Sequence, residues 1–264
     1  MVEERTSVRS VVVVEGRSLE YRIIGGDMTT PTLVFLHEGL GSMDLWREYP
    51  GDVVAATGRS GMVYSREGHG RSDPTRAPRA PDFMEHEALT MLPQLVDRLG
   101  VSAPILIGHS DGASIALIHA GAGHRVSGLV LLAPHVFVEP ESITGIEAAL
   151  ERFETTDLPE RMARHHRDPL STFHAWNDIW LDPGFRNWNI EGSLPGIDCP
   201  TLLIQGLDDE YGTLAQLDAI ERGIGGTVQR LLLEDCGHSP HLAQPARVLE
   251  ATWRFIEEIG GESR

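Results

Sequence analysis

Residues 105–114 read ILIGHSDGAS and place Ser110 between two glycines, Gly108 and Gly112. An apolar segment typical of a buried strand enters this motif, and residues 111–123, which have helical character, leave it. A G-x-S-x-G sequence between a strand and a helix is typical of a nucleophile elbow, a sharp turn that holds the serine hydroxyl clear of the backbone. Small flanking residues are needed because bulky ones would clash in such a turn. Ser110 is therefore a candidate nucleophile, and a polar residue in an ordinary strand-to-helix corner is the alternative.

The rest of the chain alternates between apolar, strand-like segments and helical ones. This rhythm predicts an α/β fold with a mostly parallel central sheet and helices on both faces. The first two strands are expected to form a hairpin around Glu15-Gly16-Arg17. Further strands are expected within residues 32–38, 61–67, 103–110, 126–138, 199–212 and 227–240, and helices within 44–58, 82–100, 111–123, 214–226 and 245–260. Pro93 lies inside the expected helix 82–100 and predicts either a kink or a helix that begins near it.

The alternation stops between residues 139 and 195. This stretch contains helical pieces, turns and six aromatic residues, which are Phe153, Phe173, Trp176, Trp180, Phe185 and Trp188. The simplest organisation is one α/β domain with a helical insertion between two of its strands. We therefore expect a core made of residues 1–138 and 196–264, with residues 139–195 as the insertion.

Composition excludes several classes of function. The net charge is −17, from 22 basic and 39 acidic residues, which argues against a nucleic-acid partner because phosphate binding needs a basic surface. No run of 18 or more apolar residues occurs, so a membrane span is not expected. Residues 1–16 lack the pattern of a signal peptide and predict a cytoplasmic protein. Two cysteines are too few for a disulfide framework, and no Cys/His spacing predicts a metal site.

A serine nucleophile needs a base, and the base needs an acid that orients it. Among 12 histidines, His238 lies in a glycine-flanked loop after an expected strand, where an imidazole can reach the carboxyl edge of the sheet. An elbow of this kind has the order serine, acid, histidine along the chain. The acid can be Asp208, Asp209 or Glu210, which follow the strand within residues 199–212, and the local pattern does not separate them.

Five segments together resemble the α/β-hydrolase family, in the order that the family has: LVFLHEGLGS, YSREGHGRSDP, ILIGHSDGAS, LLIQGLDDEYG and DCGHSPH. The resemblance extends over nearly the whole chain. It implies that the acid lies three residues after Gly206, at Asp209, with Asp208 as the alternative. It also implies that Ser72 and Asp73 form a turn, and that the insertion is the cap that covers the active site.

The resemblance further implies an oxyanion hole made by the backbone N–H groups of Asp111 and Gly39. The chain departs from the family by placing Glu38 between His37 and Gly39. A carboxylate there would oppose an oxyanion, so Glu38 either turns away to make a structural contact, which we favour, or contacts substrate. The carboxylate of Asp111 raises the same question. By their place in the family pattern, Trp176 and Trp180 of the cap and His135 after the strand within 126–138 are further candidates for the substrate pocket. The alternatives are core packing for the two tryptophans and a hinge position for His135.

The sequence thus predicts a serine hydrolase that needs no metal or organic cofactor and cleaves a small carboxylic ester or lactone. Ser110 would be the nucleophile, His238 the base and Asp209 the acid. Carbon–carbon bond hydrolysis and thioester hydrolysis use the same residues and stay open, as does a non-enzymatic role as a small-ligand receptor. A homo-oligomer is compatible with the sequence. The natural substrate is not predicted.

Overall fold

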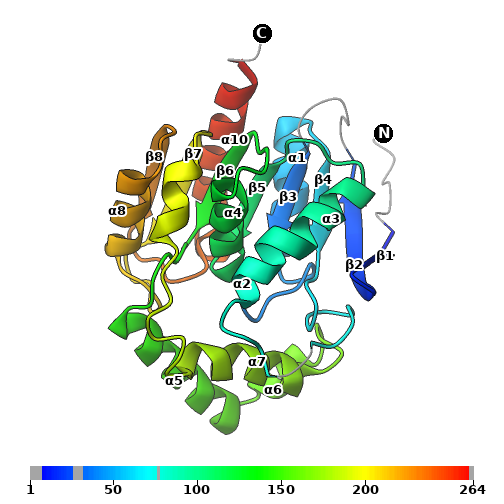
Figure 1. The fold of residues 1–264 in the computed structure, drawn as a ribbon, viewed down its shortest axis with the longest axis vertical. Helices are drawn as coiled ribbons and strands as arrows, with labels where there is room; N and C mark the ends of the chain where they lie inside the picture. The colour runs from blue at the N-terminus through cyan, green and yellow to red at the C-terminus, as the bar shows by residue number, and fades with distance from the viewer. Residues whose placement is uncertain (1–7, 26–31, 76–77, 262–264) are drawn as a thin grey trace.

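The computed structural model describes residues 8–25, 32–75 and 78–261. These residues form an eight-stranded sheet in the order β1-β2-β4-β3-β5-β6-β7-β8 (Figure 1). The strands are β1 (Ser10–Val14), β2 (Arg17–Ile24), β3 (Leu33–Leu36), β4 (Gly61–Tyr64), β5 (Ile105–His109), β6 (Gly128–Leu132), β7 (Thr201–Gly206) and β8 (Val228–Leu233). Pairs β1–β2 and β2–β4 are antiparallel and the others are parallel. This confirms the predicted mostly parallel sheet.

The predicted hairpin joins β1 to β2 through a two-residue turn. Val14 pairs with Arg17, and the turn residues Glu15 and Gly16 have φ angles of 49° and 72°. Two successive left-handed residues define the type of tight turn whose twist matches that of the flanking strands. Residues 1–7, which contributed to the expectation about a signal peptide, lie outside the described residues.

Helices cover both faces of the sheet. Within β3, Leu33 and Phe35 belong to the core beneath α1 (Tyr49–Thr57) and α10 (Pro245–Gly261). Val34 and Leu36 belong to the second core, beneath α4 (Asp111–Gly121), α8 (Leu214–Gly223) and the helical segments that precede β5. Successive side chains of a strand point to opposite faces, so a strand buried on both sides must be apolar throughout.

The first helix is shorter than expected. Residues 44–48 form turns, and α1 begins only at Tyr49. Arg47 has a left-handed backbone (φ 53°), which no α-helix can contain, so the helical pattern from Asp44 could not be realised. Helix α1 ends as predicted: Gly58 (φ 68°) donates its N–H to the carbonyl of Val54 at 2.9 Å.

The helix expected over residues 82–100 consists of three consecutive pieces. They are α2 (Phe83–His86), the π-helical turn η1 (Glu87–Met91) and α3 (Leu92–Arg98), with Pro93 in the first turn of α3. Proline has no N–H to donate and its ring clashes with the carbonyl four residues earlier. The wider turn of η1 directly before Pro93 accommodates both effects, in agreement with a helix that begins near this proline.

Three helices of the segment between β6 and β7 lie below the sheet in Figure 1: α5 (Pro140–Thr155), α6 (Leu158–Met162) and α7 (Pro169–Leu181). We call them the cap helices. The strand before them ends at Leu132, earlier than expected, and Ala133 has φ 48°. The 3-10 helix η2 (Glu191–Gly196) packs instead against α4 and α8, so residues 191–195 lie with the sheet rather than with the cap helices. No described helix is both long and apolar enough to cross a membrane.

Hydrogen bonds of two residues attach the cap segment to the loops that follow β3 and β4. His166, between α6 and α7, contacts both loops through its ring nitrogens: Nδ1 accepts the N–H of Gly70 at 3.0 Å, and Nε2 lies 3.0 Å from the carbonyl oxygen of Leu40. Thr172 donates its hydroxyl to the carbonyl of Gly68 at 2.7 Å. The cap helices are therefore positioned over the edge of the sheet where the parallel strands end.

The glycine at the start of α4 provides a test of this packing. A Cβ atom on Gly112 would overlap the carbonyl oxygen of Leu36, a backbone atom that cannot move aside. We expect Gly112→Ala to lower the free energy of unfolding by about 1–3 kcal/mol, despite the better helix propensity of alanine.

Gly51 is the matched control, because it is exposed in α1 and a Cβ there meets nothing within 4 Å. Gly51→Ala should raise the free energy of unfolding by about 0.5–1 kcal/mol. Urea denaturation followed by circular dichroism measures both. Equal stabilisation by the two substitutions would contradict the close approach of α4 to β3.

Candidate active site

The candidate site lies where the connections after β3 and β5 diverge. The chain leaves β3 toward β4 on one side, whereas it leaves β5 toward β6 on the other. In open α/β sheets, such a switch point forms a crevice at the carboxyl ends of the strands. The loops after β3, β5, β7 and β8 meet there.

Ser110 occupies a strained turn between β5 and α4. Its backbone angles are φ 53° and ψ −119°, which L-residues rarely adopt. Its N–H donates to the carbonyl of Leu132 at 2.9 Å, and its carbonyl accepts the N–H of Ala113 at 2.8 Å. A Cβ on Gly108 would lie 2.6 Å from the Cα of Ala113. The two glycines of the motif are thus required by close backbone approach, as the elbow interpretation expects.

His238 is held by Asp209. Its Nδ1 atom lies 2.8 and 2.9 Å from the two carboxylate oxygens of Asp209, whose side chain is 1% exposed. Asp209 also accepts the side-chain amide of Gln205 at 2.7 Å and the N–H of Tyr211 at 2.9 Å. Asp208 is exposed, and no hydrogen bond among the described residues joins its side chain to the imidazole. The structure therefore pairs His238 with Asp209.

These contacts set the ionisation of the pair. Burial raises the pKa of Asp209, but the His238 charge and hydrogen bonds outweigh it and hold that pKa below its usual value. Burial lowers the pKa of His238, but Asp209 outweighs it and brings that pKa above 6.5. The imidazole is consequently a stronger base than an ordinary histidine.

Ser110 and His238 both line a cavity of about 230 Å³. In the part of the chain that the structure describes, no hydrogen bond joins the Ser110 hydroxyl to the imidazole, and Nδ1 of His238 is already held by Asp209. The nitrogen left to serve the hydroxyl is Nε2. The cavity is lined by Glu38, Gly39, Leu40, Ser110, Asp111, His135, Ser142, Ile146, Trp176, Trp180, Glu210, Tyr211, His238 and Ser239.

The loop after β3 is fixed from behind by Arg66. Its guanidinium donates to the carbonyls of His37 at 2.6 Å and Glu38 at 3.0 Å, and its N–H donates to Nε2 of His37 at 3.0 Å. The indole of Trp176 covers Gly39 so closely that a Cβ there would overlap it. Among the described backbone hydrogen bonds, neither the Gly39 N–H nor the Asp111 N–H serves as a donor.

Glu38 belongs to the cavity lining and its carboxylate also contacts the buried His109, so the structural contact that we favour for it stays a prediction. Its side chain is 29% exposed and lines the cavity, with Oε2 3.6 Å from Nδ1 of the buried His109. Nε2 of His109 lies 2.7 Å from the carbonyl oxygen of His238, so this ring connects Glu38 with the loop of the histidine. Burial raises the pKa of Glu38, but the neighbouring His109 ring outweighs it and brings that pKa well below the usual range.

Asp111 also lines the cavity, although its side chain is only 1% exposed. Neither carboxylate oxygen has a hydrogen-bond partner among the described residues, and Oδ2 lies 4.0 Å from the Arg66 guanidinium. Burial raises the pKa of Asp111, and the charges of Arg66 and Arg79 together with the Trp180 indole only partly oppose this. The macrodipole of α4 favours a carboxylate at its first residue but supplies no hydrogen bond to it.

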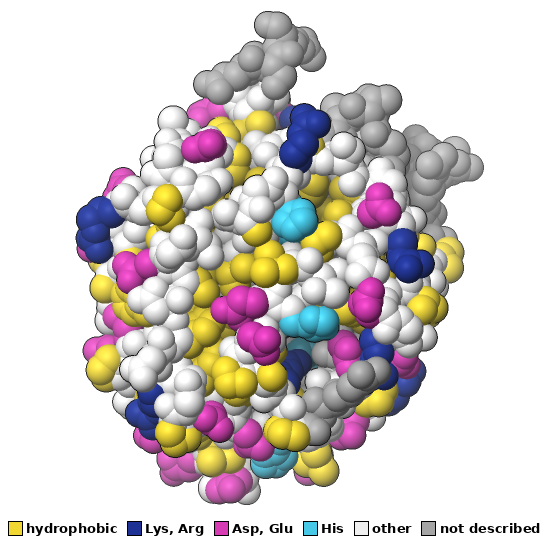
Figure 2. All heavy atoms as spheres, viewed as in Figure 1, with side chains coloured by type: hydrophobic (Ala, Val, Ile, Leu, Met, Phe, Trp, Pro, Cys, Tyr) yellow, Lys and Arg dark blue, Asp and Glu magenta, His cyan; other side chains and the backbone are white. Residues whose placement is uncertain are grey.

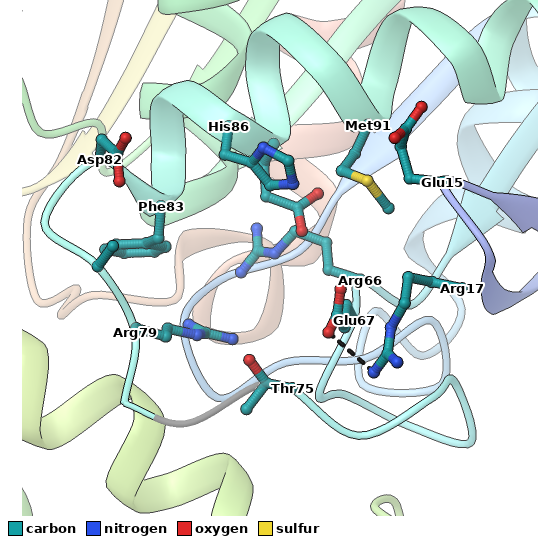
Figure 3. A pocket seen from close by; sticks show the side chains of 12 residues that line it. Glu15, Arg17, Arg66, Glu67, Thr75, Arg79, Asp82, Phe83, His86 and Met91 are labelled. Carbon is teal, nitrogen blue, oxygen red and sulfur yellow. Dashed lines mark ion pairs between the residues drawn. The ribbon is translucent and has the colours of Figure 1, made fainter.

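The arginines of this region line a different cavity of about 340 Å³, shown in Figure 3. It lies between the loop after β4 and the helical segments α2 and η1. Arg17, Arg66 and Arg79 point into it, and Arg17 pairs with Glu67 at 2.9 Å. Arg66 therefore lines this cavity and also holds the loop after β3, which contributes Glu38 and Gly39 to the cavity of Ser110.

The remaining candidates are distributed as follows. His135, Trp176 and Trp180 all line the cavity with Ser110. Ser72 and Asp73 lie elsewhere and stabilise the loop after β4: the Ser72 hydroxyl donates to the carbonyl of Ser65 at 2.7 Å, and Asp73 accepts the N–H of Ser18 at 2.8 Å. The described residues contain no cluster of three or more His, Cys, Asp or Glu side chains that could hold a metal ion.

Sequence reasoning missed the cavity roles of Glu210 and Tyr211. Glu210 accepts the backbone N–H of His238 at 3.2 Å, and the Tyr211 ring lies 4.6 Å from the imidazole ring. Both follow Asp209 directly, so their place in the loop after β7 was the available signal. Arg66, Gln205 and His109 act from outside the cavity, and no motif marks them.

Comparisons with known proteins agree with this geometry. A sequence model of the alpha/beta hydrolase family matches residues 33–251. The sn-1-specific diacylglycerol lipase ABHD11 of Mus musculus is 34% identical over 103 residues, which are 39% of this chain and only 32% of that protein. The match thus spans about a third of the length of this curated relative.

Two crystal structures share the fold. A membrane phospholipase A, described as a bacterial virulence factor, superimposes with a TM-score of 0.76 at 21% identity, over 96% of this chain and 86% of that one. The proline iminopeptidase of Mycobacterium smegmatis does so with a TM-score of 0.75 at 17% identity, over 97% and 100%. With the family model matching most of its length, the chain belongs to the alpha/beta hydrolase family.

Proposed function

We propose that this protein is a serine hydrolase that cleaves a small carboxylic ester or lactone through an acyl-enzyme. One observation carries the proposal: His238 is bonded through Nδ1 to both oxygens of Asp209, in the same cavity as a serine on a strained elbow. This arrangement gives a serine hydroxyl an oriented base. The names of the lipase and the phospholipase, both ester-cleaving activities, support the choice of ester over amide.

In the first half of the reaction, Nε2 of His238 takes the proton from the Ser110 hydroxyl as Oγ attacks the ester carbonyl carbon. The carbonyl oxygen becomes an oxyanion that accepts the N–H groups of Asp111 and Gly39. Preorganised donors of this kind stabilise the transition state by about 2.7–4 kcal/mol for a single donor. The C–O bond to the alcohol then breaks, and His238 returns the proton to the leaving oxygen.

In the second half, water replaces the alcohol. His238 takes a proton from the water as its oxygen attacks the acyl carbon, and the ester bond to Ser110 breaks with return of that proton to Oγ. Asp209 keeps the imidazole in the tautomer with the proton on Nδ1 and stabilises the imidazolium of both steps.

Ser110→Ala removes the nucleophile, so hydrolysis of p-nitrophenyl acetate and butyrate should fall by at least about 10³-fold in kcat. Ser102→Ala, on an exposed loop before β5, is the matched control and should leave both rates unchanged. Equally slow hydrolysis by wild type and Ser110→Ala would exclude this mechanism and favour a ligand-binding role.

The pH dependence follows from the base. His238 must be neutral to accept the serine proton, so kcat/KM should rise with pH through a single ionisation and reach a plateau. Because Asp209 raises the pKa of His238 above 6.5, the midpoint of the rise should lie above 6.5.

Asp209→Asn removes the charge that raises this pKa, while the burial that lowers it stays. The midpoint should therefore move to lower pH, and kcat should fall by about 10³–10⁴-fold, as expected when the tautomer is lost. Asp208→Asn changes an exposed neighbour and should do neither. A midpoint that stays in place in Asp209→Asn would contradict the assignment of His238 as the base.

A panel of esters, lactones, thioesters and β-diketones, assayed side by side, tests the bond that is cleaved. We expect the highest kcat/KM for an ester or lactone. A diketone as the best substrate would replace ester hydrolysis by carbon–carbon bond hydrolysis on the same residues.

A further inference from the structure

The cavity with Ser110 is lined by several acidic side chains, and its basic groups among the described residues are the imidazoles of His135 and His238. Glu38, Asp111 and Glu210 line it, and no Lys or Arg is among its described lining residues. Arg66 and Arg79 point into the other cavity (Figure 3). Arg152 reaches only the outer edge, where it donates to the Tyr211 hydroxyl at 3.0 Å.

The carboxylate of Asp111 is only partly compensated by the protein. Its side chain is 1% exposed, and both oxygens lack a hydrogen-bond partner among the described residues. The nearest cation, Arg66, is 4.0 Å from Oδ2 and has its own hydrogen bonds to the carbonyls of His37 and Glu38. A buried carboxylate in this state is costly unless a counter-charge is supplied. Asp111 is among the residues that line the cavity.

Glu38 adds a second charge at the same place. Glu38 directly precedes Gly39, and Asp111 directly follows Ser110. Gly39 and Asp111 carry the two N–H groups that would hold the oxyanion, so one carboxylate is on a donor residue and the other is on its neighbour. The charge of Glu38 raises the pKa of Asp111, as like charges in a partly buried site do. The oxyanion formed from a neutral substrate would be repelled by the carboxylates of Glu38 and Asp111. A substrate with its own positive charge would turn the same carboxylates into a binding site.

Aromatic rings complete the lining. The indoles of Trp176 and Trp180 and the ring of Tyr211 border the cavity. Their faces attract ammonium groups, with the strongest effect when the cation is desolvated. Carboxylates together with aromatic faces recognise an amine better than a hydroxyl or an alkyl group, both of which gain little from the charge.

We propose that the substrate carries a cationic amine, protonated or quaternary, bound in this cavity between Glu38, Asp111 and the tryptophan rings. The inference rests on the proposed function and specifies the substrate class of the same site. A volume of about 230 Å³ limits the substrate to a small molecule. The acidic surface visible in Figure 2 and the net charge of −17 would draw such a cation toward the protein.

Acetylcholine and 3,3-dimethylbutyl acetate form a matched pair of probes, since they differ by a charged nitrogen in place of a neutral carbon. We expect the ratio of their kcat/KM values to favour acetylcholine by at least tenfold. In Glu38→Gln and in Asp111→Asn the ratio should fall toward one. The ratio is the readout because either substitution can change the absolute rates.

Glu147→Gln, on the exposed side of cap helix α5, removes one acidic charge outside the cavity and should leave the ratio unchanged. A ratio of one or less in the wild type overturns the inference. So does a ratio that Glu147→Gln lowers as much as Glu38→Gln, because general attraction by the acidic surface would then explain it.

A binding measurement separates the inference from the proposed function. Choline and its neutral isostere 3,3-dimethyl-1-butanol are titrated into Ser110→Ala by calorimetry. Choline should bind at least tenfold more tightly, and Glu38→Gln in the same background should remove the difference. Ser110-dependent cleavage of the neutral ester without any preference for choline leaves the hydrolase in place and overturns the amine site. Selective choline binding without cleavage of either ester supports the amine site and overturns the ester hydrolase.

Discussion

The contact between the first turn of α4 and the end of β3 governs the geometry of the site. Gly112 lies against the carbonyl oxygens of Leu36 and His37, and Gly108 lies equally close to Ala113. Without side chains at these two positions, the strand can pass directly into the helix, and Ser110 takes the left-handed backbone that displays its hydroxyl. The same contact sets the loop after β3 beside Ser110, so Gly39 and Asp111 line one cavity with it. A single steric requirement thus brings Ser110 together with the two residues whose N–H groups we propose as oxyanion donors.

Charged side chains are distributed unequally between the two cavities of this region. Arg66 is buried, holds the loop after β3 by three hydrogen bonds, and borders the cavity that contains the other arginines. Its charge stabilises the protein's own carbonyls and only partly compensates Asp111. The described lining of the Ser110 cavity contains carboxylates, aromatic rings and the imidazoles of His135 and His238. No lysine or arginine of that lining is therefore placed to pair with an anionic group of a substrate.

Much of the fold followed from short-range patterns. The hairpin depends on two adjacent residues, and the parallel strands depend on apolar runs that alternate with helical ones. Errors arose where one residue overrode a pattern. Arg47 takes a left-handed backbone, and α1 begins only at Tyr49. Ala133 also has a left-handed backbone, and it follows directly after the end of β6. Such conformations depend on neighbours distant in sequence, and the residue types do not signal them.

For the site, the sequence by itself determined the elbow, the order of serine, acid and histidine, and a short set of candidate acids. These depend on residue types at fixed local spacing, which is visible in one dimension. The tertiary structure decided which of Asp208, Asp209 and Glu210 meets His238, because a turn gives three adjacent side chains three directions. It also decided that Glu38 and Asp111 border the cavity while Arg66 faces away from it. The direction of a side chain depends on packing between β3, β4, α4 and the cap helices, elements that are brought together only when the chain folds.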